Sequence, residues 1–166
     1  MKKLTIIING CGGAGKDTVC GIAAKHYRVV NVSSIDPVKQ AAALLGWAGG
    51  KDARSRRFLA DLKQLSADYN NYPTRYLSER HQAFLADEAA EIFFAHIREA
   101  AQIDQFKKAV GGECVTLLIT RAGVSRHHNE ADDNVGNYQY DYCFDNSGAL
   151  ETLEERFVDF LKTIVG

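Results

Sequence analysis

The chain has 166 residues and a formal net charge of −1, with 46% hydrophobic and 25% charged residues. This length and composition suit one globular domain with a full hydrophobic core. The near-neutral charge gives no overall basic surface for nucleic acid, and no apolar run reaches the roughly 20 residues that a membrane helix needs. The first apolar run is too short for a signal peptide, and the four cysteines have no CxxC spacing. We therefore expect a cytoplasmic protein that binds neither nucleic acid nor membrane.

The first predicted element is a strand that leads into a glycine-rich turn. Residues 4–8 form a β-branched apolar run, and residues 18–25 have a helix-compatible sequence. Between them, Gly10 and Gly15-Lys16 have the G-x-x-x-x-G-K spacing of a phosphate-binding loop, the Walker A motif. Such a loop turns amide N–H groups toward phosphate oxygens, while the helix N-terminus and the lysine add positive charge. The alternative is a turn that only packs tightly. We predict ATP binding by Gly10, Gly12, Gly13, Ala14, Gly15, Lys16, Asp17 and Thr18.

The position after the lysine departs from the usual motif. It is normally Ser or Thr, whose hydroxyl coordinates Mg²⁺, but here it is Asp17, followed by Thr18. A carboxylate beside a triphosphate is repulsive unless a cation screens it. Asp17 is therefore either a direct or water-mediated Mg²⁺ ligand or a partner that orients Lys16. Thr18 either caps the helix or supplies the hydroxyl to the metal.

Strands and helices alternate along the rest of the chain. Further strands are predicted at 27–33, 92–97, 114–120 and 140–145, and helices at about 37–45, 54–69, 74–90, 99–108 and 150–164. The stretch 121–139 is polar and aperiodic, which predicts a long loop. This alternation predicts one α/β domain over residues 1–166, with a parallel sheet and ligands at the carboxyl ends of its strands.

Local signals also predict how three of these helices begin and pack. Asp36-Pro37 indicates a helix start, with Asp36 as the N-cap and Pro37 at the first helical position. Apolar residues at helical spacing predict the buried faces of the next two helices. These residues are Phe58, Leu62, Leu65 and Tyr69 in the first, and Leu77, Phe84 and Leu85 in the second.

Several short stretches together resemble the phage-type deoxynucleoside monophosphate kinases. Gly15-Lys16-Asp17-Thr18-Val19 has the Asp-for-Ser change found in that group, and the later matches, in the same order, are residues 36–41, 97–99, 140–142 and 145–148. The resemblance implies a three-layer α/β/α P-loop NTPase fold, with a five-stranded parallel sheet in the order 2-3-1-4-5. It also implies a helical acceptor-binding insertion at about 46–90 and a lid at about 121–139.

The activity implied by this resemblance is transfer of the γ-phosphoryl of MgATP to a phosphorylated acceptor. The acceptor would be a (deoxy)nucleoside monophosphate, and the protein a monomer or homodimer. Dephospho-coenzyme A kinase and phosphomevalonate kinase are similar in type and remain alternatives. Phosphoryl transfer needs two substrates held in line and positive charge around the transferring oxygens. Lys16 would supply that charge at the phosphate loop.

The remaining candidate residues follow later strands. By resemblance, Arg98 would grip the acceptor phosphate, unless it is a surface arginine paired with Glu99 or Asp104. Asp36 would contact the acceptor hydroxyl or the metal shell, unless it only caps a helix. One further arginine is expected to touch a substrate phosphate, and the candidates are Arg54, Arg56, Arg57 and Arg75. On the nucleotide side, the resemblance places Arg121 and Arg126 in the lid and Asn146 in the adenine-binding turn.

Two further observations bear on metal binding. Ligand-type residues at 127–133 are close together, but a polar lid accounts for them better than a structural metal site does. No apolar run ends in the Asp of a Walker B motif, so Asp17, Asp36 or Glu99 would have to complete the Mg²⁺ shell. This argues against a GTPase or motor ATPase. It also favours a competing hypothesis, a nucleotide-binding regulatory protein without transferase activity, which the predicted acceptor and lid arginines oppose.

Overall fold

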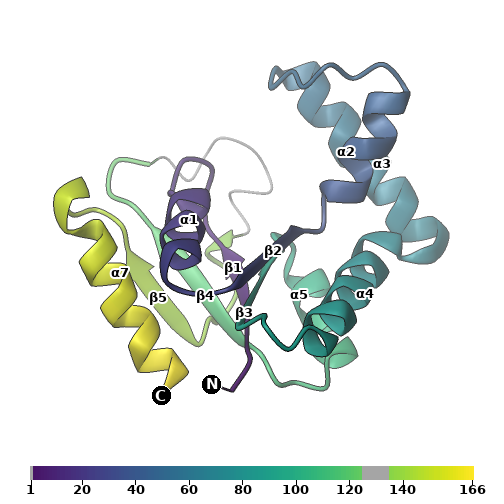
Figure 1. Cartoon of the computed structure of the whole chain (residues 1–166). Helices are drawn as coiled ribbons and strands as arrows, with labels where there is room; N and C mark the ends of the chain where they lie inside the picture. The colour runs from purple at the N-terminus through teal and green to yellow at the C-terminus, as the bar shows by residue number, and fades with distance from the viewer. Residues whose placement is uncertain (1, 125–134) are drawn as a thin grey trace.

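The computed structural model describes residues 2–124 and 135–166, which form a parallel sheet with helices on both faces (Figure 1). The strands are β1 (Leu4–Asn9), β2 (Val29–Ser33), β3 (Ile92–His96), β4 (Val115–Thr120) and β5 (Tyr142–Asp145). The helices are α1 (Lys16–His26), α2 (Asp36–Leu44), α3 (Ala53–Asn70), α4 (Tyr72–Ala86), α5 (Ala100–Ala109) and α7 (Leu150–Val165). The predicted alternation of strands and helices is confirmed. None of the helices in these two described ranges is long and apolar enough to cross a membrane.

The strand order is β2-β3-β1-β4-β5, and all of the described pairings are parallel. This confirms the α/β fold and the strand order that the resemblance implied. β1 is the central strand, and its residues 6–8 are fully buried, as expected where helices cover both faces. Because all five strands end at the same edge, the segments that follow β1, β2 and β3 meet there.

Each face of the sheet has its own hydrophobic cluster. Side chains of α1 and α7 pack on one face, around Ile8, Phe94 and Phe157. Side chains of α4 and α5 pack on the other face, where the rings of Phe93 and Phe106 stack with their centroids 6.3 Å apart. Burial of each of these side chains contributes roughly 1.5–3 kcal/mol. The two clusters therefore hold the sheet and its edge in place.

Helices α2 and α3, residues 36–70, stand away from this layered body, and we call them the arm (Figure 1). The predicted buried face of α3 is wrong in its second half, because Leu65 is 65% and Tyr69 is 86% exposed. Helical spacing identifies residues on one face, but this face of the arm has no layer of the body over it. Leu85, near the end of α4, is also 47% exposed instead of buried.

Two predicted helix starts shift in the structure. Helix α1 begins at Lys16 with Gly15 as its N-cap, so Thr18 lies inside the first turn and does not cap the helix. Helix α2 begins at Asp36 with Ile35 as its N-cap, so the prediction that Asp36 is the cap is wrong by one position. The Asp36 carboxylate instead accepts a hydrogen bond from the Ser33 N–H, at 2.8 Å, and holds the turn after β2.

Candidate nucleotide-binding site

The glycine-rich loop between β1 and α1 has a backbone that only glycine suits at several positions. Gly13 and Gly15 have φ angles of 81° and 92°, in the left-handed region. A Cβ atom at Gly10 would lie 2.6 Å from the Ile119 carbonyl oxygen, and one at Gly15 would collide with the Asn146 amide. The motif glycines therefore allow both the curvature of the loop and its close approach to β4 and the segment after β5.

The N-terminus of α1 opens directly onto this loop. Its N-cap residue, Gly15, has no side chain to cap it, and Asp17 and Thr18 are exposed in its first turn. The first N–H groups of a helix have no carbonyl partner within the helix, and the helix dipole makes this end partly positive. The arrangement is that of an anion-binding site.

Lys16 lies over the loop. Its Nζ donates to the carbonyl oxygens of Gly10, at 2.6 Å, and Cys11, at 3.3 Å. These contacts hold the ammonium group against the first two residues of the loop, where positive charge would face a bound phosphate.

Asn9, which sequence reasoning missed, connects the loop to two other segments. The side chain is 1% exposed, and its Oδ1 accepts a hydrogen bond from the Gly10 N–H at 2.9 Å. Its Nδ2 donates to the Arg98 carbonyl at 3.1 Å and to the Tyr140 hydroxyl at 2.9 Å. The Tyr140 hydroxyl in turn donates to the Val135 carbonyl, at 2.8 Å. The available signal was a carboxamide at the end of an apolar strand, immediately before the first motif glycine.

Asn146 supports the loop from the side of β5. The residue is 8% exposed, and its Nδ2 donates to the Ala14 carbonyl at 3.0 Å. Its backbone N–H donates to the Thr120 carbonyl at 2.7 Å. The side chain thus packs behind the loop, and the predicted contact between this turn and adenine stays a prediction.

The residues predicted for the acceptor side gather at the carboxyl end of β3. Asp36 follows β2 and Arg98 follows β3, and both are half-buried. His96, the last residue of β3, experiences the charges of Asp17, Lys16, Asp36 and Arg98. Burial is the largest influence and lowers the pKa of His96 below its usual value. Its Nε2 lies 2.7 Å from Asn31 Oδ1 and 3.7 Å from Cys20 Sγ.

The carboxylates considered as partners of Arg98 have other contacts. Both Glu99 oxygens accept hydrogen bonds from Lys63 Nζ, at 3.1 and 2.8 Å. The Asp104 carboxylate accepts one from the Tyr138 hydroxyl, at 2.8 Å. Of the three carboxylates proposed for a Mg²⁺ shell, Asp17 and Glu99 are exposed, and Asp17 is the one in the first turn of α1, directly after the phosphate loop. Within residues 2–124 and 135–166, no group of three or more His, Cys, Asp or Glu residues could hold a metal ion by itself.

The remaining predicted arginines are spread over three places. Arg121 is exposed directly after β4, where the Ala122 N–H donates to the Ser147 hydroxyl at 2.7 Å and joins the start of the predicted lid to the turn after β5. Arg126 and the ligand-type residues at 127–133 lie outside the described residues. Three of the four insertion arginines, Arg54, Arg56 and Arg57, are exposed on α3.

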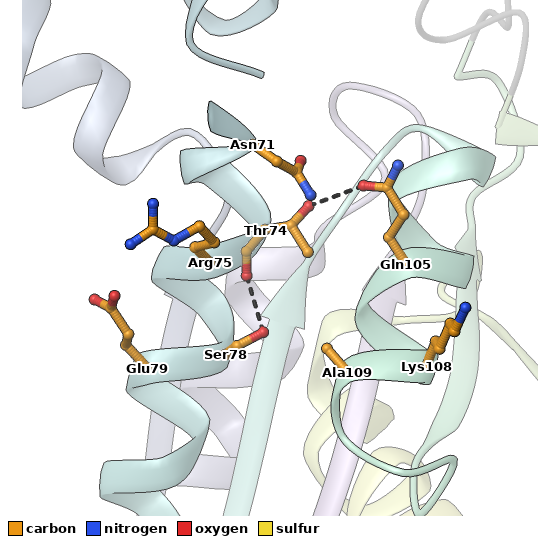
Figure 2. Close-up of a pocket in the computed structure, with 8 residues that line it drawn as sticks. All are labelled: Asn71, Thr74, Arg75, Ser78, Glu79, Gln105, Lys108 and Ala109. Atoms are coloured by element: carbon orange, nitrogen blue, oxygen red, sulfur yellow. Dashed lines mark hydrogen bonds between the residues drawn. The ribbon is translucent and has the colours of Figure 1, made fainter. Parts of the chain in front are cut away.

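The fourth insertion arginine, Arg75, lines a groove of about 450 Å³ between α4 and α5 (Figure 2). Polar side chains lie along this groove, and the Thr74 hydroxyl donates to Gln105 Oε1 at 3.3 Å. The Ser78 hydroxyl donates to the Thr74 carbonyl at 3.1 Å. Of the residues that line this groove, only Arg75 is among those that the sequence predicted for substrate binding.

A five-stranded parallel sheet in this order, with a glycine-rich loop between its central strand and the next helix, defines the fold of the P-loop kinases. The structure resembles the Mycobacterium tuberculosis APS kinase in complex with AMPPNP and APS, with a TM-score of 0.54, 13% identity, and coverage of 97% of this chain and 98% of that one. A gluconokinase from Sinorhizobium meliloti has a TM-score of 0.53 and 14% identity, over 98% of this chain and 93% of that one.

A sugar kinase from Janibacter has a TM-score of 0.55 and 13% identity, over 96% of this chain and 95% of that one. Identities this low establish a shared fold alone. No protein-family model matches the sequence, and no curated relative does. The narrower resemblance to deoxynucleoside monophosphate kinases is therefore not confirmed by these comparisons.

Proposed function

We propose that the chain is a P-loop kinase that transfers the γ-phosphoryl of MgATP to a phosphorylated small acceptor, and that the acceptor is a (deoxy)nucleoside monophosphate. The observation that carries the proposal is the phosphate loop, with its glycine-dependent backbone, uncapped helix N-terminus and Lys16 held over it. The proximity of Arg98 and Asp36 to the same end of the sheet supports a second, anionic substrate.

On the nucleotide side, the loop amides and the N-terminus of α1 would bind the phosphates of ATP. Lys16 would exchange its carbonyl partners for phosphate oxygens and offset the charge that develops during transfer. Asp17 and Thr18 would hold magnesium, which would supply positive charge to offset that of the phosphates. A site that shares Mg²⁺ with substrate phosphates needs only one or two protein oxygens, so these exposed side chains fit it.

On the acceptor side, Arg98 would hold the acceptor phosphate in line with the γ-phosphoryl through a bidentate contact. Asp36 would orient the acceptor or the metal shell from the end of β2. Arg121 and Arg126 would close over the nucleotide with the lid and exclude water, which otherwise competes with the acceptor for the phosphoryl group.

A coupled ADP-release assay across a panel of acceptors tests this proposal. The panel contains the four deoxynucleoside monophosphates, dephospho-coenzyme A and phosphomevalonate. It also contains APS and gluconate, because two structural neighbours are named as kinases for these compounds. We expect one of the deoxynucleoside monophosphates to stimulate ADP release most strongly. Binding of MgATP without stimulation by any acceptor would contradict the proposal and favour a regulatory nucleotide-binding protein.

A further inference from the structure

The only buried residue of α3 is charged. Lys63 is 8% exposed, and its Nζ contacts Glu99 Oε1 at 3.1 Å and Oε2 at 2.8 Å, from the arm to the residues that follow β3. A second ion pair on the same helix, Arg57–Asp61, is longer at 3.6 Å, and its side chains are 85% and 67% exposed. One helix therefore offers a pair that joins its buried lysine to a glutamate of the body, whose side chain is 45% exposed, and a pair in which both side chains are exposed.

The two ion pairs differ in how strongly the removal of one partner would destabilise the contact. An exposed pair contributes little, because water solvates each charge when the other is removed. Removing the Glu99 charge would leave the ammonium group of Lys63 buried without its counter-charge, which destabilises the contact, whereas removing Lys63 would leave a carboxylate that water can solvate. Lys63 is the one buried residue of α3, and its contact with Glu99 joins this helix to the residues that follow β3.

The pair is also joined to the nucleotide side of the site. Glu99 directly follows Arg98, whose carbonyl accepts the hydrogen bond from Asn9 Nδ2 at 3.1 Å. Asn9 Oδ1 in turn accepts from Gly10 at the start of the phosphate loop, at 2.9 Å. The backbone that presents Arg98 is thus held to the phosphate loop, and the Glu99 side chain holds the arm to that same backbone.

We propose that Lys63 is a positioning residue of the acceptor site. Its ion pair with Glu99 sets where the arm lies relative to Arg98, and thereby sets the affinity for a phosphate-bearing acceptor while leaving nucleotide affinity unchanged. The acceptor in this statement rests on the function proposed above. The claim that the ion pair sets the position of the arm does not rest on that function, and it is tested by a measurement that does not involve turnover.

Hydrogen–deuterium exchange of α3 is the first test. The variants are Lys63→Met and Glu99→Gln, which each break the pair with little change in volume, and the double variant Lys63→Glu/Glu99→Lys, which exchanges the charges. Asp61→Asn is the matched control, because it breaks the exposed pair on the same helix. We expect exchange of α3 amides to rise about tenfold in Glu99→Gln, to rise less in Lys63→Met, and to return toward wild type in the double variant. Exchange in α1 should not change.

Steady-state kinetics is the second test. It distinguishes a residue that positions the acceptor site from one that only supports the fold. In the ADP-release assay with dAMP, dCMP, dGMP and dTMP, we expect Glu99→Gln to raise the KM for the preferred monophosphate about tenfold and Lys63→Met to raise it less, with an unchanged KM for MgATP in both. Asp61→Asn should alter neither constant. If none of the monophosphates is phosphorylated, the proposed function fails, and the exchange measurement alone decides whether the pair positions the arm.

Two results would overturn the inference. One is α3 exchange in Glu99→Gln that matches Asp61→Asn, because the Lys63–Glu99 pair would then hold nothing that the Arg57–Asp61 pair does not. The other is an equal rise in KM for MgATP and for the monophosphate, because the pair would then support the whole site instead of the acceptor side.

Discussion

The layered body and the arm differ in what holds them together. In the body, Ile8 and Phe94 are completely buried on one face of β1 and β3, and Phe93 and Phe106 on the other. In the arm, Leu44 and Tyr69 are 90% and 86% exposed, and α3 contributes only a charged side chain to the interior. Regions with few buried apolar contacts open locally at lower free energy than the core does. We therefore expect a rigid nucleotide side and an acceptor side that opens and closes.

The largest effect on activity should come from a substitution at the phosphate loop, which belongs to the rigid nucleotide side. Lys16→Ala removes the cation above the phosphate loop and should reduce turnover in the ADP-release assay about 10³-fold or more. Lys25→Ala is a matched control, since Lys25 lies at the far end of α1 in an exposed ion pair with Glu154 at 2.6 Å. Circular dichroism should show both variants folded. Turnover in Lys16→Ala within tenfold of wild type would contradict the site.

The stability contrast between body and arm can be measured with one truncation in each. Phe106→Ala leaves a cavity beside Phe93 and should lower the free energy of unfolding by about 3–5 kcal/mol. Leu65→Ala removes a side chain that is 65% exposed and should change it by no more than about 0.5 kcal/mol. Urea unfolding measures both. Similar losses in the two variants would mean that the arm has a core of its own.

Alanine substitutions at two glycines of the phosphate loop distinguish the cost of backbone strain from the cost of a steric collision. Gly13→Ala meets an unfavourable φ of 81° in open space, whereas Gly15→Ala meets a φ of 92° and the Asn146 amide. The first should cost about 1–2 kcal/mol of folding free energy and the second more, because Asn146 must also move away from the Ala14 carbonyl. Thermal unfolding of the pair checks this order. Equal losses would show that Asn146 does not restrain the loop.

The smallest predicted effect is a dependence of body stability on pH. His81 is 4% exposed, among the rings of Phe84, Phe93 and Phe106, and its Nε2 lies 2.8 Å from the Thr5 hydroxyl oxygen. Burial lowers the pKa of His81 below its usual 6.5, as it does the pKa of His96. Below pH 6.5 the unfolded chain binds protons that the folded chain does not, so stability should be full above this pH and fall as the pH drops.

Urea unfolding at several pH values tests this dependence. His81→Gln, which cannot titrate, should reduce the slope of stability against pH below neutrality. A slope that is the same in wild type and in this variant would show that His81 is not protonated on unfolding.

The sequence was sufficient for the features that depend on neighbouring residues. Gly10 and Gly15-Lys16 identified the loop because its geometry is specified by residues next to one another, and the resemblance supplied the strand order. Contacts between distant residues were not accessible in this way. The Lys63–Glu99 pair joins residues 36 positions apart, and Asn9 meets Tyr140 across 131 positions.

The exposed face of the arm also could not be predicted from the sequence. Helical spacing correctly placed Phe58, Leu62, Leu65 and Tyr69 on one stripe, but spacing does not reveal whether another element covers that stripe. The exposure of Leu65 and Tyr69 therefore required the structure.

Isothermal titration calorimetry with magnesium-loaded AMPPNP, on the wild-type chain and on Lys16→Ala, tests whether the phosphate loop binds a nucleotide. We expect saturable heat for one site in the wild type, and binding weakened about tenfold or more in the variant, because the loop and its lysine bind the polyphosphate. Absence of heat in the wild type, or equal affinity in the two proteins, would contradict it.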